Sequence, residues 1–217
     1  MTKAIITLKQ EVDKYYCSTE AIESNYINFA QKHKLKPVLY SSLYNYSDEE
    51  ILENDIFILT GSGMISQKYI LFNENTFEQA QRDIFENKLI DLAVKHNKLL
   101  IGICRGMQLI NCYFGGKISK YFYSDRQVRI DHEITLLGKP TQVNNFHNYC
   151  VYNNDLGSSL NAIGIDEKYN ITEAFINTNG NILGLQWHPE RDFEKKISMQ
   201  NTDELISKFL NCKELTL

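Results

Sequence analysis

One cysteine of this sequence is placed as a catalytic nucleophile would be. Residues 102–106 read Gly-Ile-Cys-Arg-Gly, between an apolar run and a segment with helical periodicity. A strand-to-helix turn this tight leaves no room for a side chain two residues before or after the nucleophile, which explains both glycines. A helix N-terminus favours the thiolate of Cys104, and the N–H of Arg105 would point towards an oxyanion formed there. The alternative for such a cysteine is an inert place in the core.

A histidine and a glutamate far along the chain have the residue types that Cys104 would need as partners. Trp-His-Pro-Glu at 187–190 ends a predicted strand. In extended chain His188 and Glu190 project to the same side, and Pro189 restricts the backbone between them. The imidazole would act as general base, and the carboxylate would fix its tautomer and stabilise the imidazolium. A His-Pro-Glu tripeptide by itself is more typical of a surface turn. Together with a cysteine at a tight strand-to-helix turn, it predicts a catalytic triad of Cys104, His188 and Glu190.

The elements that must position these residues begin with an alternation of short apolar runs and helical segments. Strands are predicted over Ala4–Leu8, Pro37–Tyr40, Asp55–Thr60 and Lys98–Cys104. Helices are predicted over Thr19–His33, after a capping box at Ser47, and over Thr76–Asn97 and Arg105–Phe114. This alternation predicts a mostly parallel sheet with helices on both faces.

The second half of the chain has the pattern of short strands joined by turns. They are predicted over Ile130–Leu137, Gln142–Phe146, Tyr149–Tyr152, Ile171–Asn177 and Ile182–Trp187. Asn179-Gly180 lies between the last two and indicates a hairpin. A final helix is predicted from Thr202 to Cys212. We therefore expect one α/β domain over residues 1–217, with antiparallel strands added in its C-terminal half.

Composition narrows the class of protein. Of 217 residues, 43% are hydrophobic and 23% charged, an ordinary globular balance, and the net charge of −4 without a basic block argues against nucleic acid. The apolar runs are too short for a membrane span or a signal peptide, so a cytoplasmic protein is expected. Five scattered cysteines without a C-x-x-C pair indicate neither a disulfide framework nor a zinc knuckle. His132 and His147 have no third ligand at metal-site spacing, so neither a metal nor a cofactor is expected.

Five segments together follow the pattern of one enzyme family. They are GICRGMQ at 102–108, WHPE at 187–190, RDIFE at 82–86, NCYFGG at 111–116 and VNNFHN at 143–148. With them the chain resembles class I glutamine amidotransferase domains. More narrowly it is similar to the γ-glutamyl hydrolase branch of peptidase C26 type, which includes γ-glutamyl-γ-aminobutyrate hydrolase.

This resemblance implies a flavodoxin-like α/β fold and a Cys-His-Glu triad that cleaves a γ-glutamyl amide through a thioester. Cys104 would attack the γ-carbonyl, and His188 would protonate the leaving nitrogen and then activate water. The oxyanion hole would consist of the Arg105 N–H and a backbone N–H of the loop that holds Gly61 and Ser62. The glutamyl amino and carboxylate groups would be held by Gln108 and by Asn145, Phe146 and His147.

Two departures from the family's pattern matter. One is the segment from His132 to His147, which is shorter than in the larger γ-glutamyl hydrolases, and the other lies in a loop. The family's T-G-G-G-D-I pattern appears at 60–65 as Thr-Gly-Ser-Gly-Met-Ile, so Ser62 replaces a glycine and Met64 an acid in the loop of the oxyanion hole. Arg82, Asp83 and Glu86 share a helical face, where either surface ion pairing or a role at the active-site rim would account for them.

Three functions remain in competition. The leading one is a free-standing hydrolase of a small γ-glutamyl conjugate, with γ-glutamyl-CDP-amidate and γ-glutamyl-γ-aminobutyrate as candidate substrates. The alternative is a glutaminase subunit that delivers ammonia to a separate synthetase. The third is an amide-binding domain without catalysis, against which the intact Cys104, His188 and Glu190 argue. No residue identifies the leaving group, and the expected partners are the substrate and a second copy in a homodimer.

Overall fold

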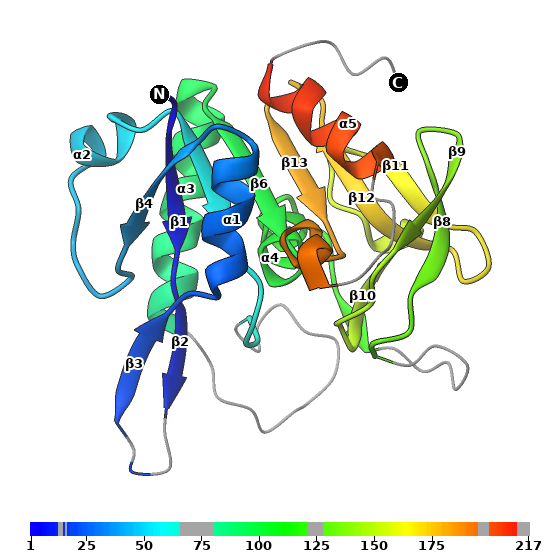
Figure 1. The fold of residues 1–217 in the computed structure, drawn as a ribbon, viewed down its shortest axis with the longest axis horizontal. Helices are drawn as coiled ribbons and strands as arrows, with labels where there is room; N and C mark the ends of the chain where they lie inside the picture. Colours follow the sequence, from blue (N-terminus) through cyan, green and yellow to red (C-terminus); the bar gives the residue numbers. More distant parts are fainter. Residues whose placement is uncertain (13–14, 16, 66–79, 121–127, 195–199, 212–217) are drawn as a thin grey trace.

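A computed structural model describes residues 1–12, 15, 17–65, 80–120, 128–194 and 200–211 of the chain. Five parallel strands form one half of a large sheet (Figure 1), in the order β4-β1-β5-β6-β13. They are β1 (Lys3–Thr7), β4 (Lys36–Tyr40), β5 (Ile56–Leu59), β6 (Leu99–Ile103) and β13 (Ile182–Leu185). Counted along the chain, this order is 2-1-3-4-5, the order of the flavodoxin-like doubly wound fold. The predicted fold class is confirmed.

The other half of the sheet is antiparallel, as predicted for the C-terminal half of the chain. Beyond β13 the order continues through β12 (Ile171–Asn177), β11 (Leu160–Asp166), β8 (His132–Leu136) and β9 (Lys139–Val143). Two further strands, β10 (Tyr149–Tyr152) and β7 (Ser119–Lys120), pair with each other, and β10 also pairs with β12. The turn between β12 and β13 contains Gly180 at φ +74°, which confirms the predicted hairpin.

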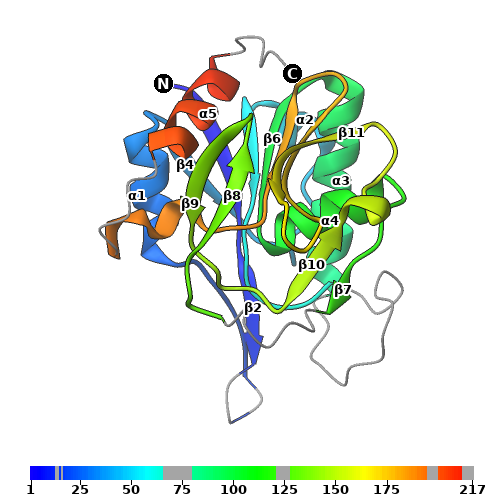
Figure 2. The same cartoon turned by 90° about the vertical axis from the view of Figure 1, so that its right-hand side faces the viewer.

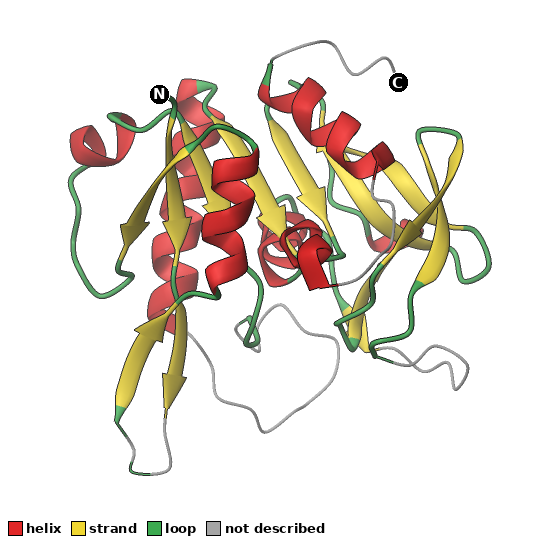
Figure 3. Ribbon diagram, in the orientation of Figure 1, coloured by secondary structure: helices red, strands yellow, loops and turns green. Residues whose placement is uncertain are grey.

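Helices cover both faces of the sheet (Figures 2 and 3). On one face lie α1 (Ser24–Lys32) and α5 (Gln200–Leu210), and on the other lie α2 (Asp48–Leu52), α3 (Ala80–His96) and α4 (Arg105–Tyr113). Neighbouring strand residues serve opposite faces: Ile6 packs in the cluster with Phe29 of α1, and Ile5 in the cluster with Leu89 of α3. Ser47 caps α2 through the predicted capping box.

The prediction of a helix over Thr19–His33 is wrong in its first part. Ser18–Ala21 forms β3, which pairs with β2 (Lys9–Val12), and the helix begins only at Ser24. Pairing with the preceding strand overrides the helical pattern here. Elsewhere β11 was not predicted, and the strand expected up to Phe146 ends at Val143.

Two predicted helices extend beyond what the structure describes. Residues 76–79 and Cys212 lie outside the described residues, and the helices observed nearest to them are α3 and α5. No helix in the described part of the chain has the length and apolar character needed to cross a membrane.

The parallel strands bring three segments to one edge of the sheet. Gly61 lies just beyond the carboxyl end of β5, Cys104 directly follows β6, and His188 follows β13. In open α/β sheets, ligands bind outside the carboxyl ends of the strands. This edge is therefore the place to look for the functional site.

Candidate active site

Cys104 is held at the turn between β6 and α4. Its φ of +53° and ψ of −104° are strained for a residue with a side chain, a conformation found at functional sites. The Cys104 N–H donates to the Leu185 carbonyl at 2.7 Å, and its own carbonyl accepts from the Gln108 N–H at 3.1 Å. The side chain is 8% exposed. The turn thus has the geometry expected of a nucleophile elbow.

The two glycines of the elbow are required by close backbone contacts. A Cβ on Gly102 would lie 2.5 Å from Ile110 Cδ1 and 2.7 Å from the Met107 nitrogen. A Cβ on Gly106 would lie 2.4 Å from the Leu59 carbonyl oxygen. The steric reason inferred from the G-x-C-x-G pattern is confirmed.

His188 and Glu190 meet beside Cys104. His188 Nδ1 lies 2.6 Å from Glu190 Oε1, and both side chains are buried. Burial alone would lower the pKa of His188, but the negative charges of Glu190 and of the Cys104 thiolate, together with their hydrogen bonds, outweigh burial and raise it to about 10. The structure therefore brings together the three residues predicted as a triad. Their arrangement suits an imidazolium that faces a thiolate.

Asn144 holds the backbone of His188. The Asn144 side-chain Nδ2 donates to the His188 carbonyl at 2.8 Å, and the His188 N–H donates to Asn144 Oδ1 at 2.9 Å. Asn144 is 2% exposed, so both bonds are shielded from water. Sequence analysis included Asn144 in a family segment without a role, because nothing near it in the chain shows which backbone it would bind.

An ion pair fixes the segment that carries Glu190. Glu190 lies in the short helix η3 (Pro189–Glu194). Arg191 of η3 donates to Glu23, the residue before α1, at 2.8 and 3.1 Å. Burial would raise the pKa of Glu23, but the hydrogen bond and charge of Arg191 lower it overall. Arg191 also lies over the Phe146 ring, 4.5 Å from its centroid. Sequence analysis did not single out Glu23 or Arg191.

The loop after β5 lies directly against the histidine. A Cβ on Gly61 would lie 2.7 Å from His188 Cε1 and 3.4 Å from Cys104 Cβ. The Gly61 N–H donates to the hydroxyl of the buried Tyr26 at 2.8 Å. Burial, followed by the charge of Glu190, raises the pKa of Tyr26 well above its ordinary value. Gly61 therefore provides space for His188, and its N–H is engaged by Tyr26.

Arg82, Asp83 and Glu86 belong to a buried ionic cluster, so surface pairing is the wrong interpretation of this helical face. Arg82 and Glu86 are both 0% exposed and are joined by a 2.8 Å hydrogen bond. Arg105 pairs with Asp83 and with Glu86, and the Thr7 hydroxyl donates to Glu86 at 2.7 Å. Burial would raise the pKa of Glu86, but Arg82 and Arg105 keep it below its ordinary value. Glu86 is therefore an ionised carboxylate.

The residues predicted to bind substrate lie at the same edge. Gln108 Nε2 donates to Gln186 Oε1 at 3.2 Å and lies 3.5 Å from the Tyr149 carbonyl oxygen. Phe146 meets the His188 ring edge-on, with centroids 5.7 Å apart.

His147 and Asn145 are buried next to these residues. His147 Nδ1 lies 2.8 Å from the Tyr149 carbonyl oxygen, and its Nε2 lies 3.7 Å from Glu173 Oε2. The His147 N–H donates to Asn145 Oδ1 at 3.4 Å. Both side chains are buried, as is that of Gln108.

His132 has neighbours that sequence spacing did not reveal. Nitrogen and oxygen atoms of His132, Asp166 and Glu173 lie within 4.8 Å of one another, with His132 Nε2 3.4 Å from Glu173 Oε1. The argument that no third ligand accompanies the histidines is wrong, because strand pairing brings two carboxylates beside His132. Asp166 accepts from the N–H groups of Lys168 and Tyr169, and Glu173 lies against both His132 and His147. These groups have protein partners, and the absence of a metal stays a prediction.

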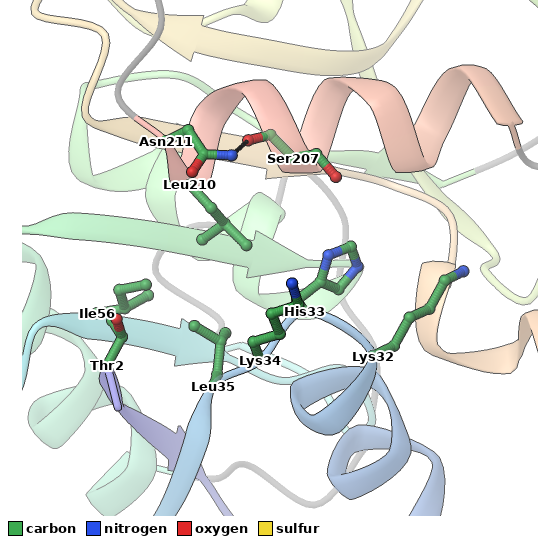
Figure 4. Close-up of a pocket in the computed structure, with 9 residues that line it drawn as sticks. All are labelled: Thr2, Lys32, His33, Lys34, Leu35, Ile56, Ser207, Leu210 and Asn211. Carbon is green, nitrogen blue, oxygen red and sulfur yellow. Dashed lines mark hydrogen bonds between the residues drawn. The ribbon is translucent and has the colours of Figure 1, made fainter.

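A separate cavity of about 330 Å³ lies at the opposite edge of the sheet, between the ends of α1 and α5 (Figure 4). Its lining includes Thr2 before β1, His33 after α1, and Leu210 at the end of α5. Lys32 at its rim is paired with Asp203. The C-termini of two helices meet there and disfavour an anion, whereas Lys32 and Lys34 of the lining favour one, so the lining does not point to one class of ligand.

Comparison with known proteins agrees with the geometry. Residues 4–190 match the family model described as peptidase C26. The glutamine amidotransferase-like protein YvdE of Lactococcus lactis is 32% identical over 171 residues, which are 66% of this chain and 71% of that protein. The γ-glutamyl-CDP-amidate hydrolase of Campylobacter jejuni is 31% identical over 135 residues, which are 62% of each chain.

Solved structures show the same fold. A protein described as a GMP synthase subunit, from Thermoplasma acidophilum, superimposes with a TM-score of 0.67 at 14% identity, over 98% of this chain and 94% of that one. A glutamine amidotransferase from Thermotoga maritima superimposes with a TM-score of 0.62 at 16% identity, over 97% and 94% of the two chains.

Proposed function

Because this chain belongs to the peptidase C26 family, we propose that it is a cysteine hydrolase that cleaves a γ-glutamyl amide. The observation that carries the proposal is the placement of His188 between Glu190, 2.6 Å from its Nδ1, and the strained Cys104. Nδ1 is occupied by the carboxylate, which leaves Nε2 for proton transfer at the thiol. The raised pKa of His188 favours the protonated ring, whose Nε2–H can then serve as the acid for the leaving nitrogen.

In the first half-reaction the Cys104 sulfur attacks the γ-carbonyl carbon, a C–S bond forms, and the carbonyl π electrons move to oxygen. The N–H groups of Arg105 and Ser62 would accept this oxyanion; we assign the loop donor to Ser62 because Tyr26 engages the Gly61 N–H. As the oxyanion collapses, the C–N bond breaks, and the Nε2 proton of His188 passes to the leaving nitrogen. A γ-glutamyl thioester and a free amine or amidate result.

In the second half-reaction the now neutral His188 takes a proton from water. The resulting hydroxide attacks the thioester carbonyl, and collapse of the second oxyanion breaks the C–S bond. Glutamate is released, and the thiolate and imidazolium pair of Cys104 and His188 is restored. Glu190 holds the ring through Nδ1 and stabilises each imidazolium.

The glutamyl end of the substrate would be held by the amide of Gln108 and by the segment of Asn145, Phe146 and His147. The similarity to a γ-glutamyl-CDP-amidate hydrolase supports γ-glutamyl-CDP-amidate as a candidate substrate, beside γ-glutamyl-γ-aminobutyrate.

The test is glutamate release from γ-glutamyl-CDP-amidate, γ-glutamyl-γ-aminobutyrate and glutamine. We expect kcat/KM for one conjugate to exceed that for glutamine by about 100-fold, the discrimination that contacts to a leaving group supply. Cys104→Ala should abolish release while circular dichroism shows an intact fold. Turnover that survives this substitution would refute the mechanism. Glutamine hydrolysis that appears only with a synthetase would establish the amidotransferase alternative.

A further inference from the structure

The loop of residues 60–65, which would supply one donor of the oxyanion hole, is called the oxyanion loop below. The buried ionic cluster of Arg82, Asp83, Glu86 and Arg105 binds the backbone carbonyl groups of this loop. Arg82 Nη2 donates to the carbonyls of Thr60 at 2.6 Å and Gly61 at 3.3 Å, and Arg82 Nη1 donates to that of Ser62 at 3.0 Å. One guanidinium thus binds three consecutive carbonyl oxygens.

Arg105 extends the same contact to the end of the loop and joins the loop to the elbow. Its Nε donates to the Met64 carbonyl at 3.3 Å, while its Nη atoms pair with Asp83 and Glu86. The backbone of Arg105 directly follows Cys104 and would supply the other oxyanion donor. A single residue therefore connects both sides of the proposed oxyanion hole.

Because the peptide bond is planar, these contacts with carbonyl groups also determine the direction of the neighbouring N–H groups. In a trans peptide the C=O of one residue and the N–H of the next point in opposite directions. The bond from Arg82 to the Gly61 carbonyl therefore aims the Ser62 N–H away from Arg82. The preceding peptide shows the same relationship, since Arg82 binds the Thr60 carbonyl and the Gly61 N–H points to Tyr26 on the other side.

We propose that Arg82 and Arg105, held by Asp83 and Glu86, are positioning residues that orient the oxyanion loop so that its Ser62 N–H faces the reacting carbonyl. This inference rests on the proposed function. The proposal also explains how the loop can keep its conformation with Ser62 at a position where the family pattern has glycine. Ser62 adopts φ +75°, which costs a non-glycine residue energy, and the Arg82 bonds on both sides of Ser62 hold that conformation.

Glu86→Gln and Arg82→Lys test the proposal. The first keeps the shape of the side chain and removes the charge that holds both arginines. The second keeps a charge, but an ammonium lacks the planar fork needed for Glu86 and three carbonyls. We expect kcat to fall about tenfold or more, because an oxyanion donor is misplaced, while KM changes by less than about threefold.

A second readout separates the oxyanion hole from the nucleophile. Alkylation of Cys104 by iodoacetamide, followed on its peptide by mass spectrometry, forms no oxyanion. Its rate should therefore stay within about twofold of wild type in both variants. A parallel loss of alkylation and kcat would show general damage to the elbow and would overturn the proposal.

Asn181→Ala is the matched control. Asn181 is equally buried and polar, but it donates to the carbonyls of Ala93 and Lys98 at the opposite edge of the sheet. Its loss should lower stability in urea and leave kcat unchanged.

If Arg82→Lys does not fold, Asp83→Asn is used in its place. That change removes the ion pair of Asp83 with Arg105 and leaves the ion pair of Arg82 with Glu86 unchanged. Folded variants of Glu86 and of Arg82 or Asp83 with wild-type kcat would overturn the proposal. Activity in Cys104→Ala would instead refute the proposed function, so the two failures are distinguishable.

Discussion

Asn144 and His188 exchange two hydrogen bonds, one in each direction, through a side-chain amide and a backbone segment. The amide thus takes the place of a neighbouring strand at the point where β13 has ended. This contact fixes the position of the His188 backbone, and with it the imidazole, at the carboxyl edge of the sheet. Its partner residues are 44 positions apart in the chain.

Asn144→Ala should lower both stability and activity. It leaves the buried N–H of His188 without its partner, at a cost of about 1–3 kcal/mol in the free energy of unfolding. The His188 carbonyl loses one of two donors and keeps the Arg191 N–H at 3.2 Å. Urea denaturation measures this cost. The kcat should fall as well, because His188 loses its position. A variant with normal kcat would show that Glu190 alone positions the histidine.

Gly61→Ala should reduce turnover more than it reduces stability. The new methyl group would lie 2.7 Å from His188 Cε1, so the imidazole must move away from Cys104. We expect kcat to fall by about 100-fold, as misplacement by 1 Å can cost. The control is Gly138→Ala, at φ +74° with no atom within 4 Å of its Cβ, which should cost stability without changing kcat.

Glu190→Gln should move the alkaline limb of the kcat/KM profile to lower pH. Burial lowers the pKa of His188, and the Glu190 charge is the largest effect that raises it towards about 10. Removal of that charge therefore lowers the pKa by about one unit or more, so the imidazolium is lost at a lower pH. The measurement is kcat/KM between pH 6 and 10.5 for both proteins. An unchanged alkaline limb would mean that this limb does not report His188.

The stability of the protein should change with pH for the same reason. The pKa of His188 is raised above its unfolded value of 6.5 to about 10 in the folded protein. Its contribution is therefore fully present below the unfolded pKa and is lost as pH rises through the folded pKa. Urea midpoints of wild type should decline across this window, and those of Glu190→Gln should decline less. Equal slopes in the two proteins would contradict this linkage.

The ion pair of Glu23 and Arg191 should contribute modestly to stability. Its side chains are 29% and 19% exposed, and it connects the start of α1 to the helix that carries Glu190. A double-mutant cycle with Glu23→Gln and Arg191→Met should give a coupling free energy of about 0.5–1 kcal/mol. A coupling near zero would mean that apolar packing alone joins these elements.

Much of the fold and the meeting of the three candidate catalytic residues could be predicted from sequence because their causes are local. The glycines around Cys104 follow from sterics within one turn, and the spacing of His188 and Glu190 follows from extended chain. The alternation of strands and helices followed from hydrophobic periodicity, and the strands that this signal did not reveal are β2, β3, β7 and β11. β3 pairs with β2 and β11 with β12, so pairing between strands, rather than the pattern within one segment, decides their structure.

The sequence by itself determined which residues are candidates for the chemistry: a cysteine at a strand-to-helix turn and a histidine with its carboxylate. Only the tertiary structure decided what surrounds them. Arg82 and Glu86 carry an ordinary i,i+4 pattern, and only the packing of α3 against the sheet shows that they are buried beneath the oxyanion loop. Likewise, the engagement of Gly61 by Tyr26 depends on contacts across 35 residues. The residue types and spacing within one segment indicate which chemistry its residues can perform. The burial of those residues and their interaction partners depend on other segments, which come together only when the chain folds.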